Sequence, residues 1–230
     1  MSSLLLLNGS PRGERSNSSK MLTRVAQGWE RAGGQPAELL HLALPPDFAR
    51  SVDAFGQTDV VLLAMPLYTD AMPGLVKTYI EAIGSRAMTA QSNTLRPTFG
   101  FLVQSGFPEA LHSRYLERYF EKLARRLGTP YAGTIVRGGG GALEDMPENA
   151  NKKLWLALRT LGEQLARNGR FNQAELKAVA GIERFPRFVA TLLSVAARLR
   201  LVEFMWNSQL KKNSAWERRF DAPYGPALRR

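Results

Sequence analysis

The 230-residue chain contains no cysteine. This absence excludes disulfide bonds, thiolate metal ligands, cysteine-bound iron–sulfur clusters and a cysteine nucleophile. Histidine is nearly as scarce, because His41 and His112 are the only two. They stand too far apart in the sequence to suggest a metal pair or a proton relay. We therefore expect no metal site in this protein.

Long hydrophobic runs are also missing. The first apolar run spans only residues 4–7 and no basic stretch precedes it, so we expect no secretory signal peptide. The apolar stretch at residues 188–197 is too short, and too closely followed by charged residues, to cross a membrane. A composition of 44% apolar and 22% charged residues is that of an ordinary soluble globule, and we expect a cytoplasmic location.

Acidic residues are much fewer than basic residues, and the formal net charge is +11. The excess is concentrated at the end of the chain, where residues 184–230 carry ten Arg and Lys but only three acidic residues. One interpretation is a solvated basic tail. The other is an anionic partner, such as a phosphorylated cofactor, a membrane surface or a nucleic acid.

One stretch near the N-terminus organises the sequence. The apolar residues 4–7 end abruptly in a polar loop rich in Gly, Ser and Arg, and an amphipathic segment follows at residue 20. A buried strand, a polar loop and a helix in this order can hold a phosphate, because the helix N-terminus offers unpaired N–H groups and a partial positive charge. The alternative is a plain turn in which Ser16 or Asn17 only caps the helix.

The remaining chain alternates between apolar and amphipathic segments. We expect further strands over residues 36–42, 59–65, 98–104 and 133–137, and helices over 18–33, 47–55, 75–83, 109–127 and 147–167. This alternation predicts an α/β fold with a parallel sheet covered by helices on both faces. Ligands of such sheets bind at the carboxyl ends of the strands, where the loops 10–18, 66–74 and 104–107 would meet.

Two motifs in these loops resemble a known family. Asn8-Gly9-Ser10-Pro11-Arg12 with Ser16-Asn17-Ser18, and Pro66-Leu67-Tyr68 with Met72-Pro73-Gly74 and Lys77, are similar to the flavodoxin-like NAD(P)H-dependent FMN reductases and oxidoreductases. The resemblance covers roughly residues 1–168. It implies a three-layer sandwich with a five-stranded parallel sheet in the order 2-1-3-4-5. It also implies an FMN-binding domain over residues 1–169 and a helical, basic extension over 170–230.

The resemblance assigns cofactor-binding residues to each loop. The FMN phosphate would be held by the first loop, through Ser10, Arg12, Ser16, Asn17 and Ser18. The isoalloxazine ring would lie along the second loop, formed by Pro66, Leu67 and Tyr68, with Met72, Pro73 and Gly74 leading into the next helix. The third loop would meet the other edge of the ring through Gln104, Ser105, Gly106 and Phe107.

The activity implied by the resemblance is an FMN-dependent oxidoreductase. NAD(P)H would give hydride to the flavin, and a quinone, an azo or nitro compound, or free flavin would accept the electrons. No side-chain acid or base is required, so we name no catalytic residue, and a homodimer is common in this family. The alternatives are a flavodoxin-type electron carrier and a flavin-free binding module. Such carriers are typically acidic and lack a long C-terminal extension, so this basic chain favours the enzyme.

Two further segments allow more than one interpretation. The four glycines at residues 138–141 can allow close approach to a ligand or a second subunit, or they can form a flexible connector. The apolar stretch before residue 198 can pack on the domain or across a dimer, which we favour, or lie on an anionic membrane. Basic and aromatic residues alternate over residues 206–224, but they match no nucleic-acid-binding motif, so we do not expect nucleic acid as a partner.

Overall fold

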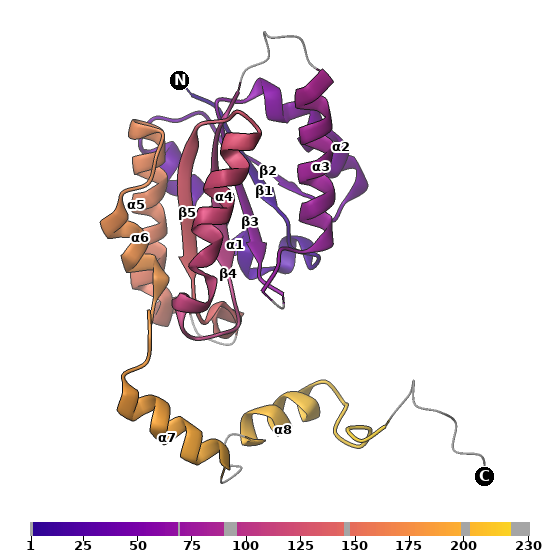
Figure 1. Cartoon of the computed structure of the whole chain (residues 1–230), viewed down its shortest axis with the longest axis vertical. Helices are drawn as coiled ribbons and strands as arrows, with labels where there is room; N and C mark the ends of the chain where they lie inside the picture. The colour runs from indigo at the N-terminus through magenta and orange to yellow at the C-terminus, as the bar shows by residue number, and fades with distance from the viewer. Residues whose placement is uncertain (1, 69, 90–95, 145–147, 199–202, 222–230) are drawn as a thin grey trace, which may run out of the picture. The chain divides into compact units, whose positions relative to one another are not determined.

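A computed structural model describes the chain except for residues 1, 69, 90–95, 145–147, 199–202 and 222–230. The described chain divides into two compact units, Met1–Arg184 and Phe185–Arg230. The first unit holds a parallel sheet and the helices around it (Figure 1). The second unit contains two helices, α7 (Arg187–Arg198) and α8 (Glu203–Lys212).

Five parallel strands form the sheet, in the order β2-β1-β3-β4-β5, which confirms the predicted order. The strands are β1 (Leu4–Asn8), β2 (Glu38–His41), β3 (Val60–Pro66), β4 (Thr98–Gln104) and β5 (Tyr131–Arg137). All five residues of β1 are buried, because β1 lies between two strands and under helices on both faces. Burial on both faces explains why its sequence is continuously apolar instead of alternating.

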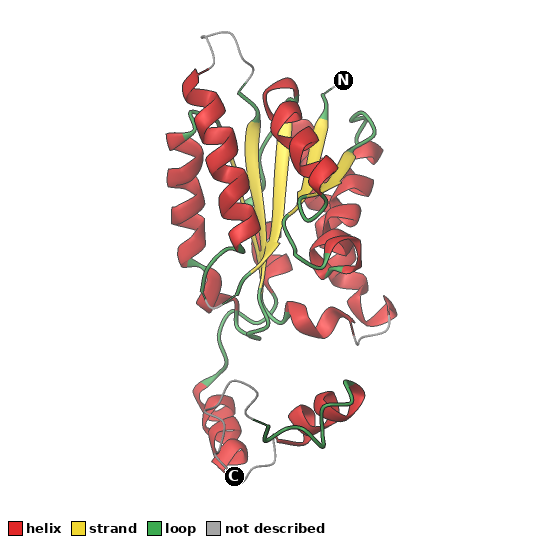
Figure 2. Ribbon diagram, turned by 90° about the vertical axis from the view of Figure 1, so that its right-hand side faces the viewer, coloured by secondary structure: helices red, strands yellow, loops and turns green. Residues whose placement is uncertain are grey.

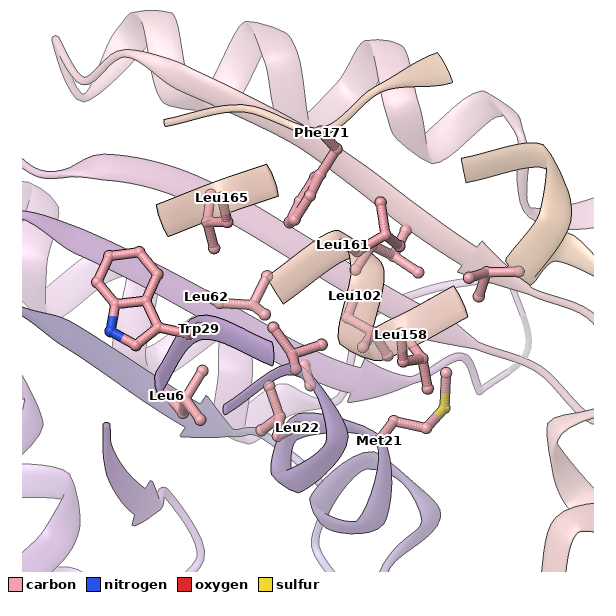
Figure 3. Packing of buried hydrophobic residues seen from close by; sticks show 14 of the residues in the cluster. Leu6, Met21, Leu22, Trp29, Leu62, Leu102, Leu158, Leu161, Leu165 and Phe171 are labelled. Carbon is pink, nitrogen blue, oxygen red and sulfur yellow. The ribbon is translucent and has the colours of Figure 1, made fainter. Parts of the chain in front are cut away.

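Helices cover both faces of the sheet (Figure 2). One face is covered by α1 (Asn17–Arg31), α5 (Lys152–Asn168) and α6 (Gln173–Ala180), and the other by α2 (Pro45–Ala54), α3 (Gly74–Thr89) and α4 (Tyr115–Arg126). Short 3-10 helices lie at Gly13–Arg15, Phe55–Gln57, Ala110–Ser113, Gly140–Glu144 and Glu148–Asn151. Successive leucines of β1 alternate between the two cores, as the pleat of a strand requires. Figure 3 shows Leu6 and Leu62 of the sheet facing Leu22 and Leu158 of the helices.

Helices α1 and α5 pack with their backbones in close contact. A Cβ atom built on Gly28 would lie 1.8 Å from the carbonyl oxygen of Arg159, and one on Gly162 would lie 2.0 Å from that of Val25. Only glycine fits at either position, because the obstructing atoms are backbone. This contact fixes α1, and therefore the position of the α1 N-terminus at the edge of the sheet.

The long helix predicted over residues 109–127 is wrong in its first part. The chain forms a 3-10 helix at Ala110–Ser113 and begins α4 only at Tyr115. The amide N–H groups of Ala110 and Leu111 donate to the carbonyl oxygens of Ile182 and Glu183, at 2.8 and 3.2 Å. This pairing with a distant segment of the chain competes with a continuous helix.

The first compact unit extends beyond Gly169, where the sequence analysis places the domain boundary, and ends at Arg184. Leu176 and Val179 of α6 are buried in the same core as α1 and α5. Helix α6 is therefore packed on the sheet domain, and the residues outside that domain begin at Phe185. No described helix is both long enough and apolar enough to cross a membrane.

Candidate functional site

Three loops leave the sheet side by side at its carboxyl edge. Strands β1, β3 and β4 are neighbours and run parallel, so the loops that follow them begin at the same edge. Gly9 N–H donates to Ala64 O at 2.8 Å, and Leu67 N–H donates to Gln104 O at 2.8 Å, which joins each loop to the adjacent strand. The structure therefore brings together the three segments that the sequence singled out.

The side chain of Asn8 holds the first loop in shape. Its Nδ2 lies 2.7 Å from Gly13 O, 3.1 Å from Ser16 Oγ and 3.0 Å from His41 Nδ1, and its Oδ1 accepts from the Ser10 N–H at 3.1 Å. Asn8 is fully buried. The sequence analysis quoted Asn8 in the motif but gave it no role. The sequence feature that could have indicated this role is the amide side chain at the end of an otherwise apolar strand.

Helix α1 begins directly behind this loop, and Ser16 is its N-cap. The Ser16 Oγ accepts a hydrogen bond from the Ser19 N–H at 3.2 Å, so of the two expected caps, Ser16 and Asn17, it is Ser16 that caps the helix. Ser10, Ser16, Asn17 and Ser18 are buried, while Arg12 is exposed. A Cβ on Gly9 would lie 2.3 Å from Val76 Cγ2, so glycine lets the loop pass close to the start of α3.

Two buried polar atoms in the first turn of α1 have no hydrogen-bond partner in the described structure. They are Asn17 Oδ1 and Ser18 Oγ. An unpaired buried polar group costs about 1–3 kcal/mol, so native structures usually pair such groups. The Ser18 hydroxyl can donate to a phosphate oxygen, whereas Asn17 Oδ1 only accepts and suits a ligand hydroxyl. The helix N-terminus adds its partial positive charge at the same place.

The second loop exposes one aromatic ring. Pro66 is the last residue of β3 and is buried, and the Leu67 side chain packs into the core. Tyr68 is 49% exposed, and it exchanges two backbone hydrogen bonds of 3.0 Å with Ala71. Further along the loop Met72 is partly buried, Pro73 is buried and exposed Gly74 begins α3. Pro66, Leu67 and Tyr68 were predicted to lie along the ring. Because Pro66 and Leu67 are buried, Tyr68 is the one of the three whose side chain can contact a ligand.

Tyr115 at the start of α4 anchors this loop, and the sequence analysis missed it. The Tyr115 hydroxyl donates to the carbonyl oxygen of Asp70. Burial, and then the nearby Asp70 carboxylate, raise the pKa of Tyr115 above its usual value. Like any tyrosine hydroxyl it is protonated at neutral pH and can donate, and the raised pKa extends this to more alkaline pH. Nothing in the local sequence signals this contact, because the two residues lie 45 positions apart.

The third loop begins with two buried residues and continues into two exposed ones. Gln104 and Ser105 are buried, and the Ser105 N–H donates to Arg137 O at 3.0 Å. Gly106 and Phe107 are exposed, and the Phe107 ring is centred 5.3 Å from the His112 ring. Tyr68 and Phe107 thus provide two exposed aromatic side chains, each just beyond the carboxyl end of its strand.

The glycine run at residues 138–141 supports the third loop. Gly140 N–H donates to Ser105 O at 2.7 Å, and Gly139 N–H donates to Phe107 O at 2.6 Å. A Cβ on Gly140 would lie 2.2 Å from Gln104 Oε1. Asn17 Nδ2 donates to Gly140 O at 2.8 Å, which links the run to the first loop as well. Gly139 and Gly140 are therefore bonded to the other site loops, while the Gly138 N–H donates to Ala180 O of α6 at 3.1 Å.

A family model described as "Flavodoxin-like fold" matches residues 2–165. The chain belongs to the flavodoxin-like fold family. No match to the chain is found among curated proteins. The flavodoxin-like assignment agrees with the strand order and with the loops at the carboxyl edge.

Solved structures with the same fold have low sequence identity to this flavodoxin-like chain. An NAD(P)H:quinone oxidoreductase from Methanothermobacter marburgensis is 15% identical with a TM-score of 0.56, covering 72% of this chain and 98% of that one. An NADPH-quinone reductase from P. pentosaceus is 18% identical with a TM-score of 0.53, covering 73% and 99%. An FMN-dependent NADH-azoreductase from Bacillus anthracis, solved in complex with FMN, is 14% identical with a TM-score of 0.52, covering 72% and 100%.

Proposed function

We propose that this flavodoxin-like protein binds FMN at the three loops and is an NAD(P)H-dependent oxidoreductase. The observation that carries the proposal is the pair of unpaired polar atoms, Asn17 Oδ1 and Ser18 Oγ, in the first turn of α1. They lie at a helix N-terminus beneath a loop that Asn8 holds in place. Similar folds include an azoreductase solved with FMN, which supports the choice of this nucleotide.

The residues present fit the two ends of FMN. The phosphate would be held by the N–H groups at the start of α1, by the Ser18 hydroxyl and by the guanidinium of Arg12. Asn17 Oδ1 would accept from a ribityl hydroxyl. Ser10 and Ser16 would shape the loop, because the Ser16 hydroxyl already caps the helix and Ser10 Oγ lies 3.3 Å from the Arg12 N–H.

The flat ring would lie against the second and third loops. Tyr68 and Phe107 would provide aromatic contact, and Gln104 would support the loop from below. The Ser105 N–H is already bonded to Arg137 O, so the Gly106 N–H is the better placed of the two to donate to the ring. When bound, FMN would supply hydride acceptance and donation, which no side chain of this protein provides.

The exposed position of Tyr68 and Phe107 would leave the ring accessible to NAD(P)H and then to a small acceptor. Quinones, azo compounds, nitro compounds and free flavin are all candidates for this acceptor. The cytoplasmic location and the homodimer expected from the sequence remain predictions.

The visible spectrum of the purified protein, with and without NADPH or NADH under anaerobic conditions, tests this function. We expect bound flavin whose absorbance is lost on addition of one of the two nucleotides alone. Flavin that needs a separate reductase would instead indicate an electron carrier. Colourless protein that takes up no added FMN would overturn the proposal in favour of a flavin-free module.

A substitution pair at Ser16 tests the phosphate end. Asp and Asn are both good N-caps, so Ser16→Asp and Ser16→Asn should each keep α1 in place. Only Ser16→Asp adds a negative charge near the phosphate. We expect its FMN dissociation constant to rise by about 10-fold or more, against a change of less than about 3-fold for Ser16→Asn. Equal affinities for the two variants would place the phosphate elsewhere.

A further inference from the structure

Helix α7 is an amphipathic helix with no buried residue among its 12 residues. Phe188, Leu192 and Val195 recur at spacings of four and three, so they share one face, and they are 72%, 65% and 45% exposed. Leu193 lies outside this stripe, about 100° around the helix from Leu192, and is 44% exposed. A contiguous exposed apolar stripe of this kind marks an interaction surface.

The face of α7 about 100° around the helix from this stripe is polar and basic. Arg187, Thr191, Ser194 and Arg198 recur at spacings of four, three and four, and all are exposed. The Thr191 hydroxyl donates to Arg187 O at 3.0 Å, and the Ser194 hydroxyl donates to Ala190 O at 2.8 Å. Both hydroxyls are therefore bonded within the helix, and they do not require a polar partner on that side.

The rest of the second unit continues the pattern of basic and aromatic residues. Lys211 Nζ lies 5.1 Å and Arg219 Cζ lies 3.9 Å from the centre of the Trp216 ring. Phe204, Trp206 and Phe220 are 75%, 71% and 85% exposed. Aromatic rings beside Lys and Arg are typical of segments that lie at a membrane surface, where one part of each side chain is apolar and the other is wet.

Charge distinguishes a lipid surface from a second copy of the chain as the partner. Residues 184–230 carry ten basic and three acidic residues, and residues 1–183 carry 21 basic and 17 acidic residues. Both parts are therefore net positive, so a second copy would bring like charge to the basic unit. An anionic bilayer offers the opposite charge and also an apolar interior for the stripe.

We propose that α7 binds to the surface of anionic membranes. Phe188, Leu192 and Val195 enter the boundary between headgroups and acyl chains, while Arg187 and Arg198 remain level with the lipid phosphates. The helix lies in the plane of the membrane. This binding places the flavodoxin-like domain beside a bilayer through the linker at Phe185 and Pro186. It rests on residues of the second unit and is independent of FMN binding.

Vesicle flotation of the full-length protein tests the proposal. We expect binding to vesicles containing about one third phosphatidylglycerol, little binding to pure phosphatidylcholine, and weaker binding at about 0.5 M salt. Two variants that each add one negative charge distinguish the contributions of the apolar and polar faces of α7. Leu192→Glu should lower the partition coefficient about 10-fold further than Thr191→Glu, because only Leu192 enters the apolar region. Equal losses, or equal binding to neutral and anionic vesicles, would overturn the proposal.

The absence of cysteine allows a second, site-specific measurement. Leu192→Cys and Ser194→Cys each give the protein a single thiol, on opposite faces of α7, for a polarity-sensitive fluorophore. We expect anionic vesicles to shift the emission of the probe at position 192 to shorter wavelength and to leave that at 194 nearly unchanged. A probe at position 192 that shifts with protein concentration in the absence of vesicles would show that a second copy covers the stripe, and would overturn the proposal. An identical response at both positions would also overturn it.

Discussion

The carboxamide of Asn17 donates a hydrogen bond to the carbonyl oxygen of Gly140 at 2.8 Å. The bond connects the first turn of α1 to the glycine run after β5, across 123 positions of sequence. Gly140 in turn donates to Ser105 O. The first and third loops of the candidate site are thus held in one network, and their spacing is set by the protein before any ligand binds.

We predict that Asn17→Ala destabilises the folded protein by about 1–3 kcal/mol, because Gly140 O loses its buried donor. Urea unfolding of flavin-free protein measures this free energy. Asn213→Ala is the matched control, since Asn213 Nδ2 donates to Gln209 O on an exposed part of the chain. We expect the control to change the free energy by less than about 0.5 kcal/mol. Similar losses in both variants would contradict a structural role for the Asn17 bond.

Two glycines in helices should respond to alanine in opposite directions. Gly162→Ala would place a Cβ 2.0 Å from the backbone oxygen of Val25, so α1 and α5 must separate, and we expect a loss of about 3 kcal/mol or more. Gly84→Ala in α3 would meet only Leu127 Cδ2, at 3.7 Å. There the higher helix propensity of alanine should stabilise the protein by about 0.5–1 kcal/mol. Thermal unfolding of the two variants, compared with wild type, checks the sign of each change.

Because Gly9 lies close to Val76, we predict that Val76→Ala partly compensates for the loss of stability caused by Gly9→Ala. Gly9→Ala alone should destabilise the protein by about 1–3 kcal/mol, because the new Cβ would lie 2.3 Å from Val76 Cγ2. Val76→Ala removes that methyl group and costs its own share of core packing. In a double-mutant cycle, the pair should therefore be less destabilised than the sum of the single variants. Strict additivity would show that the backbone shifts to avoid the clash.

The stability of the segment around Glu183 should depend on pH. The Arg114 guanidinium donates to both carboxylate oxygens of Glu183, at 3.0 and 2.7 Å. These hydrogen bonds hold the pKa of Glu183 below its usual value of 4.5. A lowered pKa in the folded state adds stability above the unfolded pKa, and that stability is lost as the pH falls through the folded pKa.

Glu183→Gln should accordingly cost about 0.5 kcal/mol at pH 7, a small value because the Glu183 side chain is 53% exposed and solvent screens the pair. The difference from wild type should shrink as the pH falls below 4.5 and disappear once the pH is below the lowered pKa of Glu183 in the folded state. Urea titrations over this pH range measure the effect. Glu121→Gln, at an exposed position of α4, is the control for loss of a surface carboxylate and should change the free energy of unfolding at pH 7 by less than about 0.5 kcal/mol. A constant cost at all pH values would rule out the ion pair as its cause.

The buried strands and the position of the three loops followed from local patterns, whereas the order of the strands came from the resemblance to the flavodoxin-like reductases. The apolar run at residues 4–7, the run ending at Pro66 and the run ending at Gln104 each marked a buried strand, because only a strand covered on both faces is apolar throughout. Alternating helices then required parallel strands, which bring their carboxyl ends to one edge. Helix ends were less accurate, since Pro45 and Pro46, which precede the helix expected over residues 47–55, form the first turn of α2.

Local sequence alone thus determined which segments are buried strands and which loops share an edge, and it limited the cap of helix α1 to Ser16 or Asn17, because periodicity and capping depend on neighbouring residues. Only the tertiary structure decided the roles of Asn8, Tyr115 and Gly140, and the division of the helix expected over residues 109–127. Each of these depends on hydrogen bonds to partners elsewhere in the chain. Such partners are brought together by the packing of the whole sheet domain, and no local pattern specifies them.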